Sequence, residues 1–252
     1  MAIISGPQRW WIDSNPTFAA KQAVVQDNLL LNLDAGVSSS LSNGGLGSTW
    51  YNLTTGNNAT RVGPTYSSSV GNGSFLFDGY NDRFTCGTFT GFNNTVTLEA
   101  WLRFTSMTAD DGDDMFIING GGSSLTFDFR TQTTQTGQLI ERKGQFRIGG
   151  GAAGTTQTIN GLSTGTWYHF AGTYDGSTMR FYLNNILQGT RSYTDYFSSA
   201  SVELGRYPYT NAPSQDVFQL NGYLSTVRIY NKALTATEVS QNFNVYKARF
   251  GL

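Results

Sequence analysis

The chain has 252 residues, of which only 13% are charged, while glycine (30 residues) and aromatic residues (14%) are frequent. This composition is typical of short strands joined by tight turns and is poor in the residues that long helices need. The formal net charge of −1 and the scattered basic residues exclude a phosphate-tracking surface, and no apolar stretch approaches the roughly 20 residues of a membrane span. We therefore expect an all-β protein with no nucleic acid partner and no insertion into a membrane.

The cellular compartment is indicated by the cysteine content and by the first residues. Cys86 is the lone cysteine, which excludes an internal disulfide framework. The start of the chain lacks a cationic segment followed by an apolar one, so we expect no signal peptide. The sequence thus predicts folding in a reducing cytoplasm.

The first 27 residues differ from the rest of the chain because they hold an apolar cluster that no strand pattern explains. Two adjacent Trp residues near a terminus either pack back onto the domain or anchor it to a partner, since Trp is enriched at interfaces. We predict residues 1–27 as an N-terminal arm and candidate anchor, and residues 28–252 as one sandwich domain. The expected partner-binding residues are Trp10, Trp11, Ile12 and Phe18.

Short strands then follow, each bounded by Gly, Asn, Ser or Thr. Between Val96 and Phe104 the residues alternate, which sets Val96, Leu98, Ala100 and Leu102 against Thr97, Glu99, Trp101 and Arg103. Many such strands predict a two-sheet antiparallel β-sandwich. The other expected strands are Leu29–Asp34, Ser74–Asp78, Met115–Ile118, Leu125–Phe129, Gln145–Ile148, Trp167–Tyr174, Met179–Leu183, Val202–Gly205 and Tyr223–Tyr230.

Two local signals are sharper than the strands. Asn184 and Asn185 tolerate positive φ and predict a two-residue hairpin turn. Near the C-terminus, Thr235 and Glu238 have the spacing of a capping box, which predicts the start of a short helix. We expect this helix to pack on a sheet through one face, formed by Ala236, Val239, Phe243 and Tyr246.

A series of motifs runs through the chain in a fixed order: LNLDAG (31–36), TWYNL (49–53), GPTY (63–66), FDG and ND (77–82), LEAW (98–101), WYH and YDG (167–176), and GYL with RIYNKALT (222–235). These motifs resemble the laminin-G-like, concanavalin A-like jelly-roll modules of bacteriophage virion proteins, notably those of cyanophages and other marine phages. The resemblance covers Leu29–Leu252 and implies a lectin-like jelly roll. Asn184-Asn185 replaces the usual Asp-Gly, and Ser225-Thr226 replaces a usual acidic pair.

Catalysis by a carboxylate pair is not expected. Glycosidases place two carboxylates about 5–9 Å apart across the scissile bond, and the four Glu of this chain (Glu99, Glu141, Glu203 and Glu238) have no acid two or three residues away on a predicted strand. His169 is expected to be a structural histidine, and Cys86 a buried, inert thiol. The sequence predicts a protein that is not an enzyme, with a glycan-active enzyme as the remote alternative.

Two loops have the oxygen ligands that Ca²⁺ prefers. We expect no required cofactor and treat calcium as an optional one. The alternatives are a solvated acidic turn for the first set and an Asx-type turn for the second. These sets are Asp110, Asp111, Asp113 and Asp114, and Asp78, Asn81 and Asp82.

A sugar ligand would stack on aromatic side chains in loops. The candidate ligand-binding residues are Tyr193, Tyr196, Arg206, Tyr207, Tyr209 and Asn211. The alternative is that these side chains fill the ends of the sandwich or contact a neighbouring subunit.

Together these features predict a non-enzymatic bacteriophage virion structural protein: a capsid decoration, fibre or appendage component. Its lectin-like sandwich would mediate protein–protein or glycan contacts. The alternative is a carbohydrate-binding, receptor-recognising tail-fibre adhesin. Expected partners are other virion proteins and cell-surface glycan. A homo-oligomer, for example a trimer, is expected by fold-level analogy.

Overall fold

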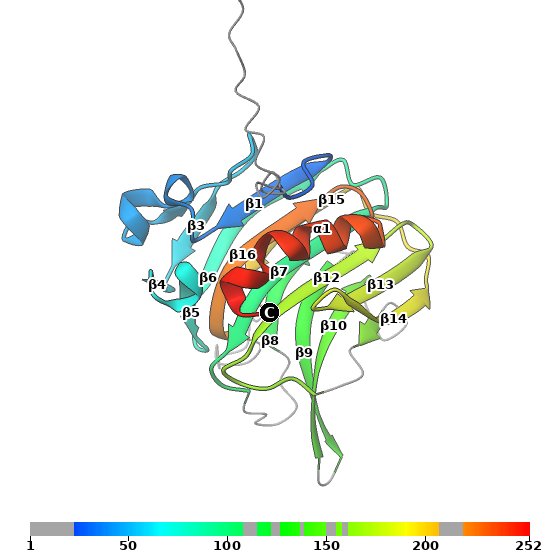
Figure 1. Cartoon of the computed structure of the whole chain (residues 1–252). Helices are drawn as coiled ribbons and strands as arrows, with labels where there is room; N and C mark the ends of the chain where they lie inside the picture. The colour runs from blue at the N-terminus through cyan, green and yellow to red at the C-terminus, as the bar shows by residue number, and fades with distance from the viewer. Residues whose placement is uncertain are drawn as a thin grey trace, which may run out of the picture.

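The computed structural model describes residues 23–107, 115–121, 127–136, 139–149, 155–157, 161–206 and 219–252. In this part of the chain the strands build two antiparallel sheets that face each other, and one α-helix lies on the outside of the first sheet (Figure 1). The expected all-β sandwich with a short C-terminal helix is confirmed. Among the described residues, no helix has the length and apolar character that a membrane span requires.

The first sheet, sheet A, has its helix-covered face outside and its other face in the core. Its strands in spatial order are β14 (Ile186–Ser192), β13 (Thr178–Leu183), β12 (Trp167–Tyr174), β7 (Val96–Phe104), β16 (Asn221–Tyr230), β5 (Ser74–Asp78) and β4 (Thr65–Ser67), with β1 (Leu29–Asp34) also paired to β16.

The second sheet, sheet B, packs on the inner face of sheet A. Its strands in spatial order are β11 (Thr155–Gln157), β10 (Leu139–Ile148), β9 (Phe127–Thr136), β8 (Met115–Gly121), β15 (Ser199–Leu204), β6 (Arg83–Thr90), β3 (Ala59–Val62) and β2 (Thr49–Trp50). The short 3-10 helices are η1 (Ser38–Ser40), η2 (Ser42–Gly45), η3 (Val70–Asn72) and η5 (Lys247–Phe250).

The core between the sheets is aromatic. The ring centroids of Trp50, Phe75 and Phe84 lie 4.8–5.2 Å apart in tilted and edge-on contacts, which favour the opposed charges of ring face and ring edge. The central strand β7 contributes one of its two faces, from Val96 to Leu102, all fully buried. The predicted alternation of this strand is therefore confirmed.

The other face of β7 is covered by helix α1 (Ala236–Tyr246) and η5. Thr235 and Glu238 form the predicted capping box, and Trp101 stacks on Phe243 and Phe250 with centroids 5.6 and 4.3 Å apart. The expected buried face of the helix was partly wrong. Ala236 is exposed, whereas the polar Asn242 is fully buried because its amide has partners beneath the helix.

The hairpin between β13 and β14 turns at Asn184 and Asn185, whose φ angles are 48° and 67°. The predicted two-residue turn is thus confirmed. The Asn184 side chain accepts the backbone N–H of His169 at 2.8 Å, so this residue holds the turn on the neighbouring strand β12.

The described chain begins on the helix side of sheet A. Gln241 Nε2 donates to the Ala23 carbonyl at 2.8 Å, the Val25 N–H donates to Asn242 Oδ1 at 2.8 Å, and Asp27 pairs with Lys232 at 2.9 Å. The end of the predicted arm is therefore fastened to α1. The anchor residues Trp10, Trp11, Ile12 and Phe18 lie outside the described residues, and the anchor stays a prediction.

Candidate functional site

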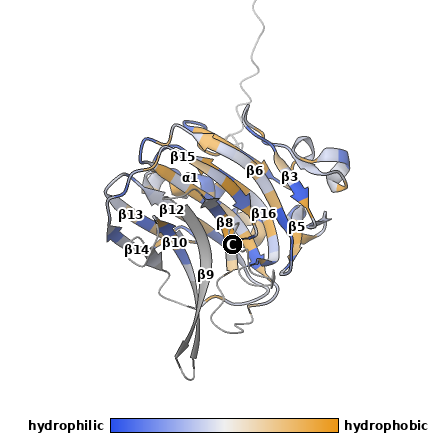
Figure 2. Ribbon diagram, turned by 180° about the vertical axis from the view of Figure 1, so that it is seen from behind, coloured by the Kyte–Doolittle hydropathy of each residue, from blue (hydrophilic) through white to orange (hydrophobic). Residues whose placement is uncertain are grey.

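The outer face of sheet B carries hydroxyl side chains on two adjacent strands, β6 and β15. Alternation along β15 sends Ala200, Val202 and Leu204 into the core and the residues between them outward. Figure 2, which views the molecule from behind, brings β6, β15 and β8 into sight. We call the outward side chains of β6 and β15 the polar face: Thr85, Thr88, Thr90, Ser199, Ser201 and Glu203.

Strand register brings the polar face together. Ser201 lies opposite Thr88, and the two hydroxyl oxygens are 2.8 Å apart. Glu203 lies opposite Asn119, and Arg206 Nε donates to Glu203 Oε2 at 2.8 Å. The site therefore offers neutral donors and acceptors beside one ion pair whose charges cancel.

Asn119 of β8, opposite Glu203, is buried behind the polar face. Its side chain is fully buried, and neither its Nδ2 nor its Oδ1 has a hydrogen-bond partner. Leaving a buried amide unpaired costs about 1–3 kcal/mol. Because its side chain has no exposed surface, Asn119 cannot contact a ligand bound on the polar face.

The thiol beneath this sheet plays no part in the polar face. Cys86 is 1% exposed on the core side of β6. Burial raises the pKa of its thiol far above the ordinary value, and the nearby Glu203 carboxylate adds to the effect. The expected burial of Cys86 is confirmed, and its lack of reactivity stays a prediction.

The structure does not gather the predicted aromatic ligand residues into one site. Tyr196 is 66% exposed before β15, whereas Arg206 follows β15, and a six-residue strand separates them by roughly 20 Å. Tyr193 is half-buried and donates to Asp195 Oδ2 at 3.1 Å. Tyr207, Tyr209 and Asn211 lie outside the described residues, so their role stays a prediction.

Of the two predicted calcium sets, one is described. The Asp78 N–H donates to Asp82 Oδ2 and the Tyr80 N–H donates to Asp78 Oδ1, both at 2.9 Å, while Asn81 is exposed. Burial raises the pKa of the Asp82 carboxyl. These contacts form an Asx-type turn. Within the described ranges no three His, Cys, Asp or Glu side chains converge as a metal site.

The other acidic set lies outside the described residues: Asp110, Asp111, Asp113 and Asp114. Calcium binding by either set stays a prediction.

The acid and the histidine considered for catalysis lie on the opposite side of the molecule from the polar face. Glu99 and His169 are both fully buried beneath α1, with His169 Nε2 3.5 Å from Glu99 Oε1. Arg228 Nη1 lies 4.0 Å from Glu99 Oε2, and Asn242 Nδ2 donates to that oxygen at 2.7 Å. This arrangement shields the pair from any substrate and joins the helix to the sheet.

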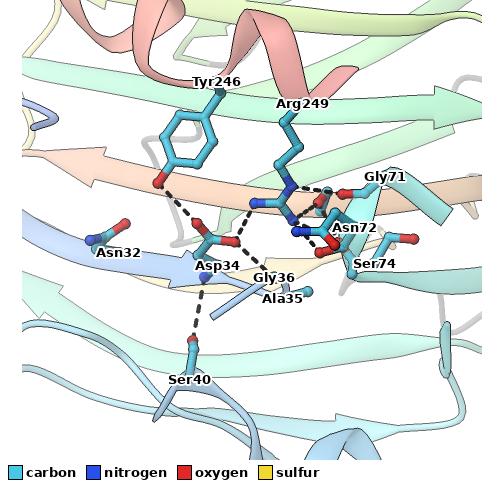
Figure 3. A network of polar contacts seen from close by, with 12 residues as sticks. Asn32, Asp34, Ala35, Gly36, Ser40, Gly71, Asn72, Ser74, Tyr246 and Arg249 are labelled. Atoms are coloured by element: carbon cyan, nitrogen blue, oxygen red, sulfur yellow. Dashed lines mark hydrogen bonds and ion pairs between the residues drawn. The ribbon is translucent and has the colours of Figure 1, made fainter. Parts of the chain in front are cut away.

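A second polar network fastens the C-terminus (Figure 3). Arg249 Nη1 donates to Asp34 Oδ1 at 2.6 Å, and the Tyr246 hydroxyl donates to Asp34 Oδ2 at 2.9 Å. Arg249 also donates to the Ser225 hydroxyl at 2.7 Å. Ser225, which stands where a carboxylate is usual, thus contributes a neutral acceptor to a network whose charges already balance.

Most residues of the polar face were missed by the sequence analysis. The alternation of Ser199, Ser201 and Glu203 with apolar neighbours was a usable signal, since it marks an outward row. The pairing of that row with Thr88 and Asn119 was not, because strand register between distant segments leaves no local pattern.

Comparison with known proteins places this geometry among lectin-like sandwiches. A family model described as the concanavalin A-like lectin/glucanases superfamily, Laminin_G_3, matches residues 78–240. No curated protein matches the sequence.

Several solved structures share the fold. Domain 4 of AbnA, a GH43 extracellular arabinanase from Geobacillus stearothermophilus, in complex with arabinotriose, has a TM-score of 0.60 and 15% identity over 87% of this chain and 98% of that domain. Trypanosoma rangeli sialidase in complex with sialic acid has a TM-score of 0.61 and 16% identity, and the match covers 90% of this chain but 34% of the sialidase. The binding domain of Paraclostridial Mosquitocidal Protein 1 has a TM-score of 0.58 and 15% identity, with 87% and 52% covered.

Proposed function

Because the chain belongs to the concanavalin A-like lectin/glucanases superfamily, we propose that it is a non-enzymatic carbohydrate-binding module that holds a glycan on the polar face. The observation that carries this proposal is the exposed hydroxyl pair of Thr88 and Ser201 on the strands that also present the Glu203–Arg206 ion pair. Sugar hydroxyls donate and accept hydrogen bonds at once, and the side-chain hydroxyls of this face can do the same. The likeness to an arabinanase domain in complex with arabinotriose supports the same ligand class.

Binding rather than cleavage is favoured by the distribution of acids. Among the side chains that the structure describes, Glu203 is the single carboxylate of the polar face, and Arg206 already holds it. Hydrolysis needs a second carboxylate about 5–9 Å away. A reducing-sugar assay with arabinan should therefore stay at background, and release of sugar that Glu203→Gln abolishes would contradict the proposal.

Binding is tested by a glycan array followed by calorimetric titration with arabinotriose. We expect Thr88→Val combined with Ser201→Ala to weaken binding roughly tenfold, which corresponds to about 1.4 kcal/mol. Thr65→Val is the matched control, because it removes a hydroxyl from the exposed edge strand β4 of the other sheet. A blank array, or equal affinity in the double variant, would rule out the polar face as the glycan site.

We further propose that the module belongs to a bacteriophage virion, as a capsid decoration, fibre or appendage component. A receptor-recognising tail-fibre adhesin is the alternative. The order of motifs from Leu31 to Thr235 supports this carrier. Antibody labelling of purified particles should show the chain at fixed positions, and light scattering should show a homo-oligomer. Particles that lack the chain by mass spectrometry would refute a virion role.

A further inference from the structure

A groove lies where helix α1 begins next to the β13–β14 hairpin, on the opposite side of the sandwich from the polar face. Figure 1 shows this helix lying over sheet A. Its first part is a shallow hollow of about 470 Å³ that is open to solvent. Its walls are almost all neutral and polar: Asn185, Ala236, Thr237, Ser240, Gln241 and Asn244.

The helix side of this groove is a stripe at helical spacing. Thr237, Ser240, Gln241 and Asn244 lie at positions i, i+3, i+4 and i+7 and so share one face. Thr, Ser and Asn form helices less readily than Ala, Lys or Glu, which surface helices usually carry. Helix stability therefore does not explain why these residues occupy the stripe. Their capacity to form hydrogen bonds at the surface does explain it.

Two asparagine side chains donate hydrogen bonds to Ser240 within the groove. Ser240 Oγ accepts from Asn185 Nδ2 at 3.1 Å and from Asn244 Nδ2 at 3.3 Å. With both lone pairs engaged, the Ser240 hydroxyl is free to donate, while each Asn keeps a carbonyl oxygen that accepts. Donors and acceptors thus alternate over a short distance, as they do around a sugar ring.

Asn185 occupies a turn position that favours glycine. Its φ of 67° lies in the left-handed region, where Gly has no steric cost. The backbone conformation therefore favours glycine here, but the chain has an asparagine, whose side chain faces Ser240 across the groove. Glycine at this position would keep the turn and remove only the amide.

A second cavity of about 340 Å³ continues the groove past Ala236, which lines both. It adds the half-exposed ion pair between Asp175 and Arg180, joined at 2.8 Å, and the aromatic ring of Tyr182. The paired charges cancel, so the groove as a whole has no preference for an anion.

We propose that this groove is a second saccharide site, which takes a neutral, hydroxyl-rich oligosaccharide. The groove shares no residue with the polar face. It lies on the outer side of sheet A, whereas the polar face lies on the outer side of sheet B. Either site can therefore be correct without the other.

The test is a titration of the ¹⁵N-labelled full chain with arabinotriose, followed by NMR. We expect shifts at Asn185 and along 236–244, and a roughly tenfold weaker response of these signals in the double variant Asn185→Gly, Asn244→Ala. Asn43→Gly is the matched control, because Asn43 is an exposed, left-handed asparagine in another turn.

The pattern of shifts separates the two proposals. Shifts at Ser201 and Thr88 without shifts along 236–244 overturn the groove and leave the polar face standing. Shifts confined to the groove overturn the polar face. Shifts in neither region, or groove signals that the double variant leaves unchanged, overturn the groove proposal.

Discussion

The side chain of Asn242 is expected to hold the helix, the start of the sandwich and the central sheet together. Its Oδ1 accepts the Val25 N–H at 2.8 Å, and its Nδ2 donates to Glu99 Oε2 at 2.7 Å and to the Tyr230 hydroxyl at 2.9 Å. A hydrogen bond to a buried carboxylate contributes roughly 2 kcal/mol and each neutral bond roughly 1 kcal/mol. We therefore expect Asn242→Ala to lower the free energy of unfolding by about 4 kcal/mol.

For a chain of this size, each kcal/mol shifts Tm by roughly 2–4 °C, so Tm should fall by roughly 8–16 °C in calorimetry. Asn244→Ala is the control, since it makes the same change on the exposed side of the same helix and should alter stability by less than about 0.5 kcal/mol. Hydrogen exchange should accelerate at the Val25 amide in Asn242→Ala alone. Equal Tm values for the two variants would refute this reasoning.

Three further predictions follow from the described contacts. Removing residues 1–22 should leave Tm unchanged, whereas removing 1–27 should lower it, because the second deletion takes the backbone that α1 binds. Burial raises the pKa of Asp175, but hydrogen bonds from Arg180 and the turn outweigh it and hold the value at about 2. Since this folded-state pKa lies below the unfolded value of about 3.9, the pair stabilises the fold above pH ~4 and loses that effect as the pH falls through ~2. Asp175→Asn should therefore flatten the acid side of a Tm-against-pH curve, and an unchanged curve would contradict the assignment. Cys86 should react with a thiol reagent only at the rate of unfolding, because burial raises its pKa; fast labelling of the native chain would be inconsistent with this.

The sequence was informative wherever a local rule decides the structure. The period of two in Val96–Phe104, the left-handed preference of Asn184, and the capping box of Thr235 each act over a few residues, and each was confirmed. The burial of Asn242 was missed because hydrophobic periodicity treats Asn as a surface residue, although Glu99, Val25 and Tyr230 converge on it from distant segments.

The candidate sites were less accessible to sequence reasoning for the same reason. Single exposed aromatic residues such as Tyr196 can be recognised in the sequence as candidate ligand contacts. Their separation cannot, because Tyr196 and Arg206 lie at the two ends of β15, and that depends on the length and direction of the strand. The polar face depends on the register between Ser201 and Thr88, which are more than 100 residues apart. Such pairings follow from the whole fold.

The buried charges and the neutral surface sites are physically connected. The ionic groups beneath α1, among them Glu99, Arg228 and the Asp34–Arg249 pair, fix the helix on sheet A from below. A helix held in this way keeps Ser240 and Asn244 in one arrangement at the groove. The protein side of the site then loses little conformational entropy when a flexible sugar binds. Loss of the Asn242 contacts should therefore weaken saccharide binding in the groove, although Asn242 is fully buried and the groove lies on the helix's other side. The polar face depends instead on the rigidity of sheet B, so its affinity should not change in the same variant.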